Sequence, residues 1–214
     1  MAVINELLSG IHRYFPNVMI AALIVIGLLT AKVGWVLVGV GAILLAIIVL
    51  ILQYTINKMI GLGDLPGIDV LKACSIIPSV SSNAVYRTTP SVWMALTSFF
   101  LTYILVNAVN VYNTTPAKKA KDSIPVQQRK GLGVLSMLAV AILFILLLIP
   151  RYASPCESTA GTIMGLALGG AAGWGWWQIL NACGADVYPD IHGVMLGLRP
   201  ASLRTSPVVC APKA

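Results

Sequence analysis

Long runs of apolar residues, separated by short polar connections, dominate the chain. Between residues 17 and 56 the only charged side chain is that of Lys32. A single helix over this stretch would be ~60 Å long, about twice the ~30 Å thickness of the hydrocarbon core of a bilayer. The pattern therefore predicts a helical hairpin that turns near residues 30–34. Lys32 then reaches the headgroups and avoids a cost of about 2.5–3.5 kcal/mol at mid-membrane.

Three further apolar runs complete the predicted architecture, which is all-α: an integral membrane helical bundle with about five transmembrane helices. The predicted spans are residues 17–31, 34–56, 92–112, 132–149 and 159–180, within a transmembrane bundle over residues 17–181. The connection 57–91 contains an apolar patch that is too short to span a bilayer. Residues 182–214 contain several prolines and are expected to form an extended basic tail.

The first sixteen residues have a different pattern. Their apolar residues, Ile4, Leu7, Leu8, Ile11 and Phe15, follow the spacing of one helical face. This spacing predicts an interfacial amphipathic segment over residues 1–16. A simple extension of the first span on the water side remains open as the alternative.

Glycine recurs every four residues in the fifth run, at Gly161, Gly165, Gly169 and Gly173. Such a series makes a smooth groove that another helix can approach closely, so these residues are predicted to pack helices together. The residues expected at the membrane interface are an aromatic belt and two basic residues: Trp174, Trp176, Trp177, Lys32 and Arg151.

Two amides, Asn107 and Asn110, lie one turn apart in the third run. In lipid, such a face is expected to turn toward another helix and form interhelical hydrogen bonds. The alternative is that the amides line a pore formed by several copies of the chain.

Composition excludes a soluble domain. Hydrophobic residues make up 58% of the 214-residue chain and charged residues 10%, whereas soluble domains carry about 25% charged residues. The net charge is +7. Lys and Arg are more numerous on the side of the membrane where Lys32, the connection 113–130 and the tail are predicted to lie. This side is therefore expected to face the cytosol during insertion. The residues expected to contact lipid headgroups or partner proteins are Lys118, Lys119, Lys121, Arg129, Lys130, Arg199 and Arg204. Specific nucleic-acid binding is not expected, because these residues form no single dense patch.

Catalytic chemistry finds little support in the sequence. The two histidines, His12 and His192, lie on opposite predicted faces, and no Cys-x-x-Cys pair exists. Asp64 and Asp69 lie in a glycine-rich connection without a partner base. Neither enzymatic activity nor a catalytic, cofactor or metal site is expected.

An ordered set of residues extends over about 90–198: the stretch from Pro90 to Phe100, then Asn107, Tyr112, 128–130, Arg151, Cys156, Glu157, the glycine-rich span, 175–177, Cys183, Gly184 and 190–193. This set resembles a family of small multi-span virion membrane proteins of nucleocytoplasmic large DNA viruses, such as chlorella viruses and giant viruses. The resemblance implies a structural protein of the internal virion membrane, of the minor capsid type.

That resemblance also implies partners and a location. The partners are the lipid bilayer, other capsid or virion membrane proteins, and further copies of the chain. The expected location is the internal membrane of the virion, and a host intracellular membrane during assembly. An oligomeric channel or pore-forming protein is the alternative function.

Overall fold

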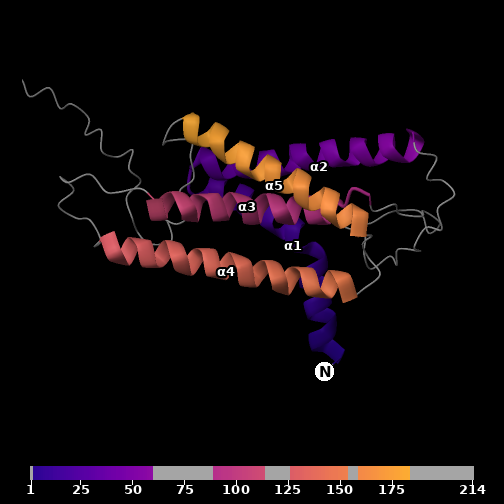
Figure 1. Cartoon of the computed structure of the whole chain (residues 1–214), viewed down its shortest axis with the longest axis horizontal. Coiled ribbons are helices and arrows are strands. Elements are labelled where there is room, and N and C mark those ends of the chain that lie inside the picture. Colours follow the sequence, from indigo (N-terminus) through magenta and orange to yellow (C-terminus); the bar gives the residue numbers. More distant parts are fainter. Residues whose placement is uncertain (1, 60–88, 114–125, 154–158, 184–214) are drawn as a thin grey trace, which may run out of the picture.

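The computed structural model describes residues 2–59, 89–113, 126–153 and 159–183, and these residues form five α-helices and no strand (Figure 1). The helices are α1 (Ala2–Leu29), α2 (Val33–Met59), α3 (Val92–Asn113), α4 (Val126–Ala153) and α5 (Thr159–Ala182). The all-α prediction is confirmed. Three helices are long and apolar enough to cross a membrane, over Val33–Ile56, Val92–Asn113 and Lys130–Ile149. The apolar part of α1, Tyr14–Leu29, is shorter, and α5 is not among the three.

Consecutive helices run in opposite directions, so the bundle has two ends (Figure 1). At the first, which we call the Lys32 end, lie the turn between α1 and α2, the end of α3, the start of α4 and the end of α5. At the other, the Lys58 end, α2 and α4 end while α3 and α5 begin. The close contacts agree, because Gly133 near the start of α4 lies against Tyr112 near the end of α3.

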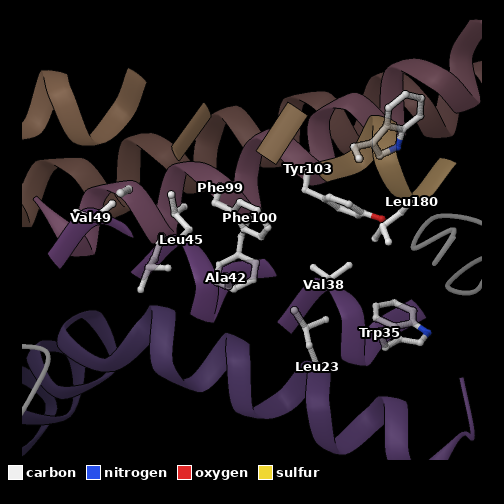
Figure 2. Packing of buried hydrophobic residues seen from close by; sticks show 13 residues of the cluster. Leu23, Trp35, Val38, Ala42, Leu45, Val49, Phe99, Phe100, Tyr103 and Leu180 are labelled. Atoms are coloured by element: carbon white, nitrogen blue, oxygen red, sulfur yellow. The ribbon is translucent and has the colours of Figure 1, made fainter. Parts of the chain in front are cut away.

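Helix α3 lies at the centre of the bundle and contacts all four other helices. Its larger buried cluster is shared with α1, α2 and α5, and the α2 members Val38, Ala42, Leu45 and Val49 follow one helical face. Figure 2 shows these side chains directed toward the aromatic rings of α3. The rings of Phe99 and Phe100 are arranged edge to face, with their centroids 5.4 Å apart. A second cluster, around Trp93, Met94, Leu101 and Leu147, joins α3 to α4.

The predicted hairpin turn is present at residues 30–32. The N–H of Lys32 donates to the carbonyl of Gly27 (2.9 Å) and the N–H of Ala31 donates to that of Leu28 (3.3 Å). These two bonds form a Schellman motif, which requires a left-handed residue after the helix, and Ala31 adopts it with φ 51°. The side chain of Lys32 is exposed at this turn.

Two predicted boundaries differ from the helices. No helix boundary lies between the predicted interfacial segment 1–16 and the first span, because α1 is one continuous helix with Pro16 inside it. Helix α4 extends beyond the predicted span 132–149 in both directions, so Arg129, Lys130 and Arg151 are helical. Both differences have the same reason. Hydropathy predicts only the apolar part of a helix, whereas the backbone hydrogen bonds of the helix continue into its polar ends.

Candidate functional site: a glycine-lined helix interface and two apolar surfaces

The glycines of α5 face the backbone of α3. A Cβ atom at Gly165 would lie 2.7 Å from the carbonyl oxygen of Ser91, and one at Gly173 would lie 2.5 Å from that of Phe99. At Gly169 a Cβ atom would collide with the carbonyl oxygen of Ala95. The contact advances in the same direction along both helices, so α3 and α5 run parallel. Only glycine permits so close an approach at these three positions.

Hydrogen bonds stabilise the interface between α3 and α5 at the Lys58 end. The N–H of Ser91 donates to the carbonyl of Gly161 (3.0 Å), and the hydroxyl of Ser91 accepts from the N–H of Met94 (3.1 Å), which caps α3. The amide of Gln53 on α2 donates to the carbonyl of Pro90. Three helices therefore meet at the residues that precede α3.

One further hydrogen bond crosses from α3 to α5 deeper in the bundle. The hydroxyl of Ser98 donates to the carbonyl of Leu166 (3.0 Å). Because a hydroxyl in lipid has no water to bond with, bonds of this kind help hold membrane helices together.

Sequence reasoning missed the other close-packing glycines. A Cβ atom at Gly27 would lie 2.9 Å from the backbone nitrogen of Val36, and one at Gly39 would lie 2.8 Å from the side chain of Ile24. Gly133 brings α4 close to Ala108. These residues lack the four-residue repeat of α5. The available signal was the presence of glycine within runs that are otherwise strongly apolar.

The three tryptophans of α5 have three different surroundings. Trp174 is 53% exposed, as expected for an outward-facing residue. Trp177 is only 7% exposed and belongs to the core. Trp176 lies against Gly41, and its indole N–H donates to the carbonyl of Leu37 on α2 (3.1 Å). Of the three, Trp174 therefore has the most outward-facing side chain, because residues two and three positions further along a helix point in other directions.

Asn107 lies in the interior, with 0% exposure, and neither polar atom of its amide has a hydrogen-bond partner within the described part of the chain. Asn110 is half-buried. Asn107 thus does not face an open, water-filled path in the single chain.

The described basic side chains lie at the two ends of the bundle. Lys32 and Lys130 are exposed at one end, and Lys58 is exposed at the other. The ammonium group of Lys130 lies 5.5 Å from the centroid of the Tyr112 ring, a cation–π distance. Lys118, Lys119, Lys121, Arg199 and Arg204 lie outside the described residues, and Arg129 and Arg151 are placed in the first and last turns of α4.

Two apolar surfaces cover the outside of the bundle. The exposed large apolar residues of α2 include Val40, Ile43, Leu44, Ile47, Ile48, Leu50 and Ile51, and those of α4 are Val134, Leu135, Leu138, Ile142, Leu143, Ile145, Leu146 and Ile149. Apolar surfaces this extensive are rare on monomeric proteins surrounded by water, and they mark sites that contact other proteins or a membrane.

Comparisons with known proteins provide no assignment. No protein-family model matches the chain, and no match was found among curated proteins or solved structures.

Proposed function

We propose that this protein is a structural, non-enzymatic membrane protein whose helices are embedded in a lipid bilayer. One observation supports the proposal most directly: of its three stretches long and apolar enough to cross a membrane, the two most apolar are the least buried. The apolar stretch of α4 has a mean hydropathy of 3.1 and is 17% buried, whereas that of α3 has 1.8 and is 67% buried. Folding in water would place the most apolar helix inside. A lipid solvent removes that requirement and favours close packing and polar contacts between helices instead.

The interior supports a structural role. Backbone-to-backbone contact between α3 and α5, the Ser98 hydrogen bond and the Trp176 hydrogen bond make a bundle fixed by specific contacts. A protein that links a bilayer to an outer layer of protein needs this property, because force applied at one end must not separate the helices.

A more specific proposal, here called the finer proposal, says which membrane holds the bundle. It rests on the resemblance in residues 90–198. Several of the residues that carry it, Pro90, Ser91, Trp93 and Asn107, are buried in the described structure. In this proposal the bundle lies in the internal membrane of a large DNA virus particle and fastens it to capsid proteins. The contacts to those proteins come from the basic residues of the Lys32 end and from the tail 182–214.

Fractionation of virus particles tests the finer proposal. The protein should co-purify with virions, remain in the membrane fraction after extraction with high salt, and be released only by detergent. A chain that lacks residues 198–214 should still insert into membranes but enter particles less efficiently. Absence from purified virions would contradict the viral role and leave the membrane embedding standing.

Purified protein in liposomes separates this function from the channel alternative. No ion flux above that of protein-free liposomes is expected, because Asn107 is enclosed by the bundle. Flux that a bulky replacement at Asn107 abolishes would instead support a pore.

A further inference from the structure

Helix α1 has two parts that run in different directions. Figure 1 shows the part that includes the N-terminus lying across the direction of the bundle, while the remainder runs along it behind α3. Pro16 lies inside the helix. Proline lacks the N–H of an i→i−4 hydrogen bond, and its ring collides with the preceding turn, so it is a physical cause of such a bend. We call residues 2–15 the N-terminal arm.

The arm leaves the bundle at a defined level. Phe15 packs against the cluster of Trp93, Met94, Leu101 and Leu147. Trp93 is the second residue of α3, and Leu147 lies two residues before the end of the apolar stretch Lys130–Ile149. The arm therefore departs from the bundle where the apolar parts of its neighbours end, at the Lys58 end.

The length and the sequence of the arm suit a membrane surface. Fourteen helical residues extend ~21 Å, less than the ~30 Å hydrocarbon core. On a helix, Ile4, Leu7, Leu8 and Ile11 share one face with Phe15, while Glu6, Ser9 and Arg13 fall on the other. An apolar stripe opposite a polar face is the pattern of a helix that lies in the plane of the interface.

We propose that the N-terminal arm is an interfacial anchor: it lies on the membrane surface at the Lys58 end and inserts its apolar stripe at the boundary between headgroups and acyl chains. The inference rests on the proposed embedding of the bundle. Glu6 and Arg13 offset each other, so the binding comes from apolar area and does not require anionic lipid. The arm fixes the depth of the first helix, whose own apolar part is short.

Spin labels on the full-length protein in phosphatidylcholine vesicles test the proposal. Single cysteines replace Leu8 or Ile11 on the stripe, and Glu6 or Ser9 opposite it, after the four native cysteines are changed to serine. Collisions with oxygen report hydrocarbon, and collisions with a water-soluble nickel complex report water. The ratio of oxygen to nickel collisions should be about threefold or more higher for labels at 8 and 11 than at 6 and 9.

A label at Leu138→Cys, on the exposed face of α4, is the internal reference for the hydrocarbon. If that label reports hydrocarbon while all four arm labels report water, the arm is not an anchor and the bundle is still embedded. If all four report hydrocarbon without alternation, the arm is inserted across the membrane and the proposal is wrong. If the Leu138 label reports water, the embedding fails and the anchor fails with it.

Discussion

Single glycines determine whether α3 and α5 can meet. We predict that Gly169→Ala destabilises the bundle by about 1–3 kcal/mol, the usual cost of overpacking a closely packed site, because the new methyl group would collide with the carbonyl of Ala95. Gly175→Ala is the matched control, since a Cβ atom there meets nothing within 4 Å. It should be neutral or stabilise the helix by up to about 1 kcal/mol. Unfolding in detergent micelles measures both, and equal losses would contradict the interface.

Asn107 provides a prediction of opposite sign. Its buried amide has no partner within the described residues, and an unsatisfied buried polar group costs about 1–3 kcal/mol. Asn107→Leu, which keeps the branching of the side chain, should therefore leave the bundle equally stable or more stable in the same assay. A loss above about 2 kcal/mol would mean that the amide bonds to something the described chain does not contain.

At the scale of residues, periodicity predicted more than residue type did. The four-residue repeat of α5 identified Gly165, Gly169 and Gly173, because one period places them all on one face. Residue type alone did not predict that Trp176 would lie against Gly41 of a distant helix. That contact depends on the tertiary packing of α2 against α5, which leaves no local signal.

At the scale of elements, the pairing of α3 with α4 is the simplest to test. A Cβ atom at Gly133 would lie 3.1 Å from the Cβ of Tyr112, close to the Cβ separation of a disulfide, about 3.5–4.5 Å. Tyr112→Cys with Gly133→Cys, in a chain without its native cysteines, should cross-link on mild oxidation.

The control for that cross-link is Tyr112→Cys with Gly131→Cys, since nothing lies within 4 Å of a Cβ atom at Gly131. It should cross-link at least about tenfold more slowly, because two cysteines bridge only when their Cβ atoms are close. Gel mobility after proteolysis between the helices measures both pairs. Equal rates would show that α3 and α4 do not meet in this register.

The helices themselves were largely predictable. Each predicted span lies within a helix apart from residues 30–31 at the hairpin turn, because long apolar runs in a chain with few charges leave helices as the natural solution. The sequence left open whether the first span extends through Pro16, and hydropathy did not predict that α4 would begin at Val126. In α1 the pattern of apolar residues changes at Pro16, yet the helix continues through this residue. A change in the apolar pattern therefore did not mark the end of a helix.

At the scale of the molecule, the arrangement of apolar and polar parts fits a slab of lipid. Apolar side chains cover the outer faces of α2 and α4, and the described lysines lie at the two ends of the bundle. A bilayer has the same profile, apolar in the middle and polar at both surfaces. The central claim is therefore that the bundle crosses a membrane, with Lys32 and Lys130 on one side and Lys58 on the other.

Labelling of single cysteines in sealed membrane vesicles, with a maleimide that does not cross membranes, tests this claim most directly. Lys32→Cys and Lys130→Cys should react from the same side, and Lys58→Cys only from the opposite side. Ile47→Cys and Leu138→Cys, on the exposed apolar faces of α2 and α4, should react from neither side until detergent dissolves the bilayer. Reaction of either apolar-face cysteine in intact vesicles, or of Lys32→Cys and Lys58→Cys from one side, would contradict the membrane-spanning bundle.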